Sequence, residues 1–207
     1  MNHTLGPRQT QKQQTRQSLL DAGLRLLDHQ SLSSLGLREV TREAGLTPSG
    51  FYRHFHDLPE FGMALVEESF GSLRTLIRAI RTEQADSDEV IDRSLEVLAA
   101  YVHEHRARLN FLVRERHGGV RPVRDAIAAR IRQFAEDLAD DLAAQPLSAG
   151  WAAQDIQMLA DLYADHTVST VAALLEAEAD PDAEQRITAT ARRQLRLISV
   201  AREHWLR

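Results

Sequence analysis

The stretch LREVTREAGLTPSGFYRHF, residues 37–55, decides the fold. Its first half carries apolar residues at helical spacing and ends on Gly45, where a left-handed backbone commonly closes a helix. Thr47 then stands where an N-cap is needed, and Pro48 occupies the first position of a second helix, where its missing N–H costs nothing. The order predicts two short helices joined by a tight turn, which is a helix–turn–helix.

The second short helix is small at its tip and basic on its outer side. Its two phenylalanines are four residues apart and are expected to face the core, while Arg53 points outward and suits a bidentate contact to guanine. Tyr52 and His54 are expected to bond phosphates, with Arg38 as a further phosphate contact. An ordinary helical hairpin with a solvated basic face is the alternative. The residues expected to contact DNA are Arg38, Thr47, Ser49, Gly50, Tyr52, Arg53 and His54.

Charge is distributed unevenly along the chain. Residues 1–56 hold seven Lys and Arg against four acids, or +3, and four histidines besides. Since the whole chain carries −5, the remainder carries −8. A small basic head on a larger acidic body favours a polyanion as the partner of the head, although local variation in composition would produce the same asymmetry.

Apolar residues recur with a helical period along the whole chain. No segment alternates with a period of two for long enough to form a strand, and breaks containing Gly or Pro separate the helical segments. We therefore predict an all-α protein of about nine helices. Residues 1–56 are expected to form a three-helix helix–turn–helix DNA-binding domain, and residues 57–207 a larger helical-bundle ligand-binding and dimerisation domain.

Composition and missing motifs exclude several classes of protein. The chain has no cysteine, which excludes disulfides, zinc–thiolate sites and thiol catalysis. No run approaches the roughly 20 apolar residues of a membrane span, so a cytoplasmic protein without a membrane partner is expected. No glycine-rich phosphate loop and no Gly-x-Ser-x-Gly elbow is present, and we expect neither an enzyme nor a cofactor. An enzyme with convergent titratable groups and a helical adaptor that binds only protein are the alternative classes.

Metal binding is not expected either. His103 and His105 point about 200° apart around a helix and cannot share one ion. Asp161 and Asp165 share a helical face, but a metal site there would need further ligands from a partner helix.

The segment LREVTREAGLTPSGFYRHFHDLPEFGMALV, residues 37–66, resembles the DNA-binding head of TetR-type regulators. The resemblance lies in the helix–turn–helix, in the ending YRHF and in the long helix that follows at once. It implies an all-helical ligand-binding domain behind the head and a homodimer built by the last two helices. Two positions depart from the family pattern. Gly36 replaces a capping threonine, and Leu58 replaces a lysine that contacts phosphate.

A narrower resemblance connects the chain to the FabR and DesT type regulators of unsaturated fatty-acid synthesis. It is carried by the head, by the acidic DLPEFG that follows it and by FLVRERHGG at 111–119. It implies a repressor of fatty-acid desaturation or synthesis genes that responds to long-chain acyl-CoA. A TetR-type repressor of an efflux or catabolic operon that senses another small hydrophobic molecule is the alternative.

An aliphatic lining with few aromatics suits a flexible alkyl chain, and arginines suit the phosphates of CoA. The same residues would equally serve as an ordinary core, and the arginines as solvated faces or as contacts between helices. The residues expected to bind the effector are Arg74, Arg78, Leu95, Leu98, Arg114, Arg116, Ile127, Ile131, Phe134, Leu159 and Tyr163.

The last two helices, predicted at about 151–178 and 183–205, are apolar on more than one face. One face must be covered by the chain itself and the other by a partner, which predicts a homodimer. A twofold dimer reads half-sites about 34 Å apart, so the operator should be an inverted repeat of double-stranded DNA. The expected interface residues are Leu162, Leu174, Leu195, Ile198 and Trp205.

Overall fold

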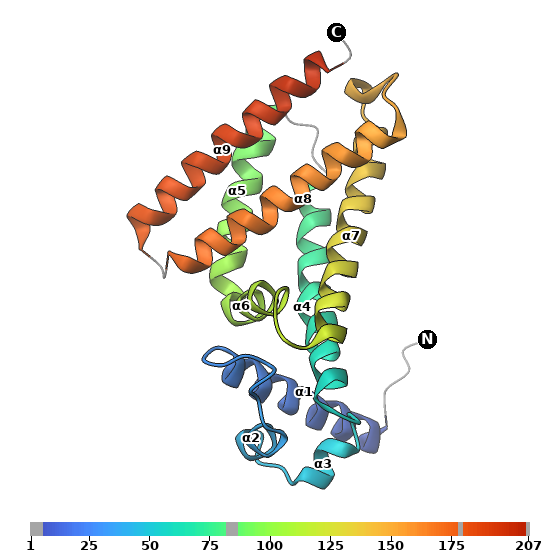
Figure 1. The fold of residues 1–207 in the computed structure, drawn as a ribbon, viewed down its shortest axis with the longest axis vertical. Helices are drawn as coiled ribbons and strands as arrows, with labels where there is room; N and C mark the ends of the chain where they lie inside the picture. Colours follow the sequence, from blue (N-terminus) through green and yellow to red (C-terminus); the bar gives the residue numbers. More distant parts are fainter. Residues whose placement is uncertain (1–5, 82–86, 178–179, 206–207) are drawn as a thin grey trace.

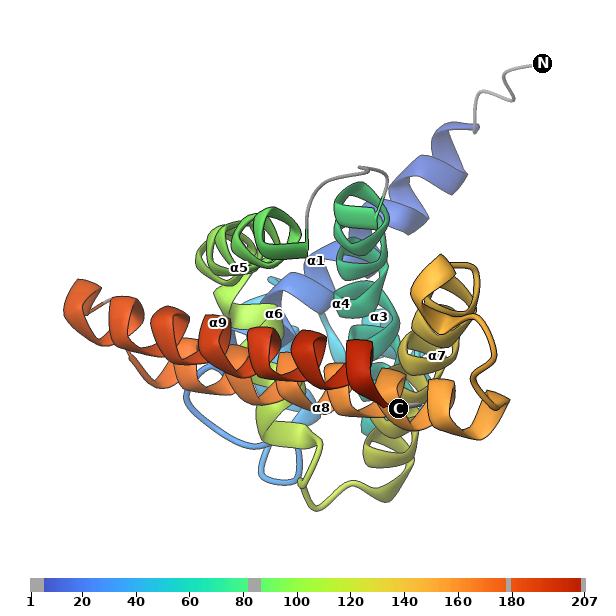
Figure 2. The same ribbon diagram turned by 90° about the horizontal axis from the view of Figure 1, so that it is seen from above.

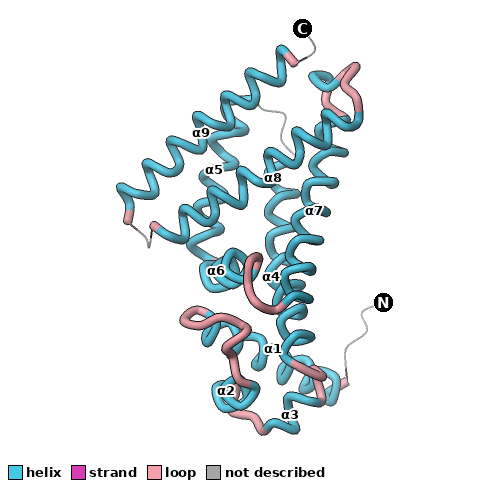
Figure 3. The backbone as a smooth tube through the Cα atoms, viewed as in Figure 1, coloured by secondary structure: helices cyan, strands magenta, loops and turns pink. Residues whose placement is uncertain are grey.

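A computed structural model describes residues 6–81, 87–177 and 180–205, and their side chains except at 7, 72–81, 87–88 and 203. Over these residues the chain forms nine α-helices and one short 3₁₀ turn but no strand, as the helical periodicity predicts (Figures 1 and 3). No helix in this described part is long and apolar enough to cross a membrane. The elements are α1 (Pro7–Leu27), α2 (Leu37–Glu43), α3 (Pro48–Tyr52), α4 (Leu58–Arg81), α5 (Ser87–Glu104), α6 (Arg106–Glu115), α7 (Arg121–Ala143), the 3₁₀ turn (Pro146–Ser148), α8 (Ala153–Glu176) and α9 (Pro181–His204).

The turn between α2 and α3 closes as the sequence predicts. Gly45 has a φ of 68°, a left-handed backbone that glycine adopts without strain. Its N–H donates to the carbonyl of Arg42 over 3.1 Å, and the N–H of Leu46 donates to the carbonyl of Thr41 over 2.8 Å. These two bonds form a Schellman motif, which satisfies the last carbonyls of α2 and directs the chain into α3.

The starts of the two short helices differ in part from the prediction. Thr47 occupies the N-cap position of α3, and Pro48 follows at the first helical position. The hydroxyl of Thr47 does not cap the helix, however, because it lies 3.0 Å from the hydroxyl of Ser49 instead. At α2, the N–H of Gly36 donates to Oε2 of Glu39 over 2.9 Å. This bond is half of a capping box and offsets part of the loss of a capping side chain at that position.

Three phenylalanines form the centre of the head. The ring centroids of Phe51, Phe55 and Phe61 lie 5.2 to 5.6 Å apart, which brings α3 against the first turns of α4. α1 approaches closely because Gly23 lacks a Cβ, which would clash with the ring of Phe61. The same apolar cluster continues into α6, α7 and α8, and Leu58 packs against its edge. The apolar core therefore continues across residues 56 and 57. The division into two domains at that point stays a prediction.

The body ends in an antiparallel pair, α8 and α9, which crosses the outer side of the bundle (Figures 1 and 2). A second apolar cluster, separate from the first, forms around Leu142, Leu159 and Ala160, where α7 meets α8. The guanidinium of Arg202, which is buried near the end of α9, donates to Oγ of Ser148 over 2.6 Å. This bond holds the end of α9 against the turn between α7 and α8.

Candidate functional site

α3 presents one buried and one exposed face at the end of the molecule opposite the α8–α9 pair (Figure 1). Phe51 is fully buried, whereas Tyr52 is 59% exposed and Arg53 is exposed beside it. Ser49 is also exposed at the start of the helix, and Arg38 is exposed in the first turn of α2. The faces of α3 are therefore those that the sequence predicts, and the DNA contacts of these side chains remain predictions.

His54 lies just after α3, in a group of cations contributed by two helices. Its Nδ1 is buried and finds no hydrogen-bond partner among the described residues. Burial lowers the pKa of His54 below its ordinary value of 6.5, and the charges of Lys12, Arg16 and Arg53 lower it further. The guanidinium of Arg16 lies 5.2 Å from the ring centroid of Phe55, within the range of a cation–π contact.

Sequence reasoning missed Lys12 and Arg16 as members of this surface. The two residues lie on α1, far from α3 in the chain, and only the packing of α1 against the head brings them beside His54. The one signal available in the sequence is their spacing of four residues, which places them on one helical face.

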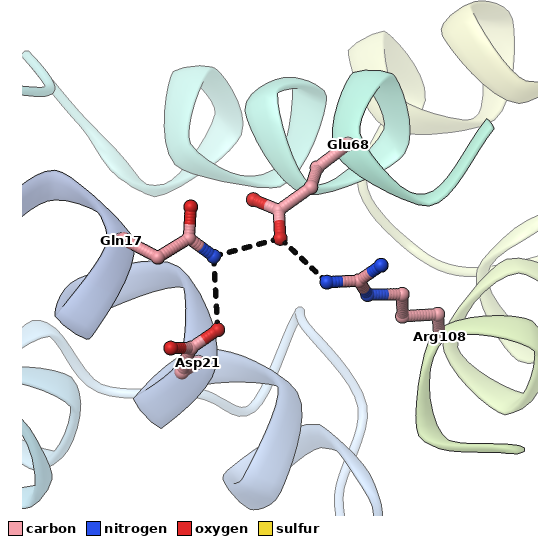
Figure 4. Close-up of polar contacts among 4 residues, drawn as sticks. All are labelled: Gln17, Asp21, Glu68 and Arg108. Carbon is pink, nitrogen blue, oxygen red and sulfur yellow. Dashed lines mark hydrogen bonds and ion pairs between the residues drawn. The ribbon is translucent and has the colours of Figure 1, made fainter. Parts of the chain in front are cut away.

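A polar network connects the head to the body. Oε1 of Glu68 on α4 accepts from Nη2 of Arg108 on α6 over 3.0 Å and from Nε2 of Gln17 on α1 over 2.8 Å (Figure 4). The same Nε2 donates to Oδ1 of Asp21 over 2.9 Å. One carboxylate oxygen thus ties together three helices, of which α1 belongs to the head and α6 to the body.

The end of α6 makes a second and more buried connection to the head. Nη1 of Arg114 donates to the carbonyls of Leu27 over 2.9 Å and Gln30 over 3.2 Å. Oε1 of Glu115 accepts from the N–H of Leu32 over 2.8 Å. Arg114 therefore binds the end of α1 and the loop after it. A contact between segments was the alternative role given for the arginines, and this placement does not support a role for Arg114 in binding the effector.

The residues predicted to bind the effector do not form a single set. Ile127, Ile131 and Leu98 belong to the first apolar cluster, whereas Leu159 and Tyr163 belong to the second. Leu95 and Phe134 belong to neither cluster; Leu95 is buried and Phe134 is half-buried. Arg116 is half-buried at the end of α6. The side chains of Arg74 and Arg78 lie outside the part of the chain that the structure describes.

The residues predicted to form the dimer interface differ in how much of their surface a single chain leaves exposed. Leu174 is only 4% exposed within a single chain, so it belongs to the core and has no surface to offer a partner, contrary to the prediction. Leu195 and Ile198 are half-buried. Leu162 is 49% exposed, and Leu197, outside the predicted set, is 70% exposed. Trp205 is half exposed, and its ring centroid lies 6.2 Å from that of Trp151.

Exposed apolar residues of α8 and α9 gather at one level of the helix pair. Nε2 of His166 lies 3.1 Å from Oε1 of Gln194, which fixes the antiparallel register. Leu162 lies one turn before His166, and Leu197 lies about one turn after Gln194, which places the two leucines at the same level of the antiparallel pair. Met158 and Val200 extend the exposed apolar patch along the same helices.

Potential metal ligands do not converge in the described residues, where no group of three His, Cys, Asp or Glu could hold an ion. Oδ1 of Asp161 accepts from Gln157 on its own helix over 2.9 Å. Nε2 of His103 lies 3.1 Å from Oε2 of Glu184 on α9.

Comparisons with known proteins agree with this geometry. Residues 19–57, which span the C-terminal part of α1 and all of α2 and α3, match the family model described as bacterial regulatory proteins, tetR family. Among solved structures, the chain is similar to the fatty acid degradation regulator FadR from Bacillus halodurans. The TM-score is 0.71 at 13% identity, and the alignment covers 93% of this chain and 96% of that one.

Two further structures share the fold. FadR from Bacillus subtilis in complex with stearoyl-CoA has a TM-score of 0.69 at 11% identity, with 86% of this chain and 96% of that one covered. A gamma-butyrolactone receptor, described as ArpA-like, has a TM-score of 0.59 at 20% identity, and the alignment covers 91% of this chain and 99% of that one. At these identities the likeness shows the fold alone. With the match over 19–57, it supports a TetR-like fold with an N-terminal helix–turn–helix.

Proposed function

We propose that this protein is a TetR-family repressor that binds inverted-repeat operator DNA as a homodimer and responds to a long-chain acyl-CoA. The observation that carries DNA binding is the surface of α3, where exposed Tyr52 and Arg53 stand beside the cations around His54. An exposed side with this charge and with hydrogen-bond donors suits a phosphate backbone and the edges of bases.

In the proposed complex, α3 enters the major groove. Arg53 donates to a guanine, while Tyr52, His54 and Arg38 bond phosphates. Ser49 and Gly50 are small, so the start of the helix can approach the base pairs closely. Because two copies related by a twofold axis read half-sites about 34 Å apart, the operator is an inverted repeat.

The exposed apolar patch of α8 and α9 supports the dimer. Met158, Leu162, Leu197 and Val200 lie on adjacent antiparallel helices and are all exposed in a single chain. Pairing of this patch with the same patch of a second copy makes a four-helix interface that removes the leucines from water.

The effector is proposed to bind between the two apolar clusters of the body. Phe134 lies on α7 between Ile131 of the first cluster and Leu138 of the second. Leu95 is buried on α5 without belonging to either cluster. A region whose expected lining is aliphatic apart from Phe134 and Tyr163 suits an alkyl chain. The stearoyl-CoA bound to a protein of the same fold supports this class of effector, as does the resemblance to regulators of unsaturated fatty-acid synthesis.

A second candidate has the same DNA function and a different effector. The gamma-butyrolactone receptor of the same fold supports another small hydrophobic molecule as the signal. The target is then an efflux or catabolic operon, the alternative that the sequence leaves open.

A titration of operator binding tests both parts of the proposal. An operator is first selected from random duplexes with the full chain, and its affinity is then measured with stearoyl-CoA, oleoyl-CoA, free fatty acid, free CoA and a gamma-butyrolactone. We expect a long-chain acyl-CoA to change the affinity at least fivefold, the low end of useful coupling. Selection of no duplex at all contradicts DNA binding. A response to the butyrolactone alone supports the second candidate.

A pair of variants locates the effector. Phe134→Ser should reduce the response to acyl-CoA, because it removes the ring between the clusters. Leu147→Ser, at an exposed position on the 3₁₀ turn, serves as the control and should respond as the unaltered protein does. Equal responses from all three proteins would move the effector away from Phe134.

A further inference from the structure

The first turns of α1 are unusual because they are helical without packing against the rest of the chain. In the described part, every side chain from Arg8 to Gln14 is exposed, and the first buried residue of the helix is Leu19. Figure 2 shows this end of α1 projecting beyond the other helices. A helix that is polar all round must obtain its stability from within or from a partner, since it has no apolar face to bury.

Charges within the helix do not provide that stability. Arg8, Lys12 and Arg16 follow each other at intervals of four residues and form one basic stripe along the helix. Like charges at this spacing destabilise an isolated helix, and no acidic residue precedes Asp21 to offset them. A basic residue at a helix N-terminus is also unfavourable to the helix dipole. A polyanion bound along the stripe neutralises these charges, and so removes both the repulsion between them and their conflict with the helix dipole.

The stripe continues the surface of α3. Arg16 lies over the ring of Phe55, and the charges of Lys12 and Arg16 act on His54 just after α3. From Arg16 to Arg8 the helix rises about 12 Å, which matches the axial rise of three to four nucleotides in one strand of B-DNA. The stripe therefore lengthens the basic surface that begins at α3, and a nucleic acid bound to α3 can also reach the stripe.

We infer that the basic stripe of α1, formed by Arg8, Lys12 and Arg16, is a second DNA-binding element that binds backbone phosphates flanking the base pairs read by α3. The inference rests on the proposed function and extends it, because it assigns contacts outside the helix–turn–helix. Since phosphates carry no sequence information directly, the stripe adds affinity and salt dependence but no base preference.

The experiment measures how operator affinity depends on salt for the full chain and for Lys12→Gln. Lys12 is exposed, so its substitution leaves the fold intact. A dimer loses two phosphate contacts, and the slope of log K against log salt should become shallower by about 1.8. Between 50 and 200 mM salt, the variant should therefore lose about 12-fold less affinity than the unaltered protein. Arg132→Gln, at an exposed position on α7, removes the same charge and is the control.

The outcomes separate the inference from the proposed function. A shallower slope for Lys12→Gln, with the slope of Arg132→Gln unchanged, supports the stripe. Slopes that agree among all three proteins while the unaltered chain binds its operator overturn the stripe and leave the proposed function standing. A slope that changes equally in both variants overturns it too, because the effect then follows net charge. An unaltered chain that binds no duplex contradicts the proposed function itself.

Discussion

The backbone N–H of Leu32 donates to Oε1 of Glu115 over 2.8 Å and joins the loop after α1 to the last residue of α6. Both residues are buried, with Glu115 only 1% exposed. The second oxygen of Glu115, Oε2, has no hydrogen-bond partner among the described residues. This buried bond is one of several contacts between head and body, beside those of Glu68 and Arg114, and its removal should have a measurable cost.

Replacement of Glu115 by leucine should lower the free energy of unfolding by about 1–3 kcal/mol, because the N–H of Leu32 is then buried without an acceptor. Urea unfolding followed by circular dichroism measures the change. Glu115→Gln is the matched control, since its amide oxygen can still accept the bond, and it should lose less. Equal losses in the two variants would show that the charge of Glu115, rather than its bond to Leu32, stabilises the joint.

Gly118 should tolerate no larger residue. A Cβ at this position would clash with Oε2 of Glu115, a buried side chain whose other oxygen is held by the N–H of Leu32. Gly118→Ala should therefore lower the free energy of unfolding by about 1–3 kcal/mol through overpacking. Gly71→Ala is the control, because a Cβ there meets no described atom within 4 Å and alanine is favoured over glycine in a helix interior by about 0.5–1 kcal/mol. A gain of stability in both variants would contradict the tight packing around Glu115.

Arg53 should read a base. Arg53→Ala is expected to cost about 1–3 kcal/mol of binding to the selected operator and to relax the preference at one base pair. Competition assays with single-position operator variants measure this. Tyr52→Phe, which removes a donor to phosphate, should instead weaken binding to all operator variants alike. If Arg53→Ala also lowers affinity uniformly, Arg53 contacts phosphate and our assignment is wrong.

His54 should make the free energy of unfolding fall as the pH is lowered, because its surroundings disfavour the protonated ring. Burial and three neighbouring cations lower its pKa in the folded chain below the ordinary 6.5. Between the two pKa values the unfolded chain binds more protons, so the free energy of unfolding rises with pH in that window. As the pH falls below about 6.5 toward the folded pKa, the protein should lose stability that His54→Gln retains.

Urea unfolding of the two proteins from pH 7.5 to 5 measures the difference. His56→Gln, at an exposed position, controls for the substitution itself. A stability difference between the unaltered protein and His54→Gln that stays constant over this range would show that His54 is not depressed.

The dimer should depend on the exposed apolar patch. Leu162→Glu combined with Leu197→Glu places two carboxylates per chain on the proposed interface and should yield monomers, because the charges would have to be desolvated on association. Light scattering coupled to size-exclusion chromatography measures the mass. Met63→Glu, on the exposed side of α4, should leave the oligomeric state unchanged. A stable dimer from the double variant would place the interface elsewhere.

Local order along the chain determined the helix–turn–helix. The left-handed Gly45 and the Pro48 helix start follow from neighbouring residues, because turn and cap geometry depends on contacts over four or five positions. The prediction that the hydroxyl of Thr47 caps α3 was wrong, and the cause is also local. A nearby hydroxyl on Ser49 competes with the backbone for the hydroxyl of Thr47, and the sequence does not decide between two local partners.

Tertiary structure decided which residues act together. α8 and α9 are apolar on more than one face, so periodicity alone could not show that Leu174 belongs to the core while Leu197 is exposed. The angle at which helices dock settles which face is covered. The same holds for Lys12 beside His54 and for Glu115 beside Leu32, since contacts between distant segments depend on packing across the whole fold and leave no periodic trace in the sequence.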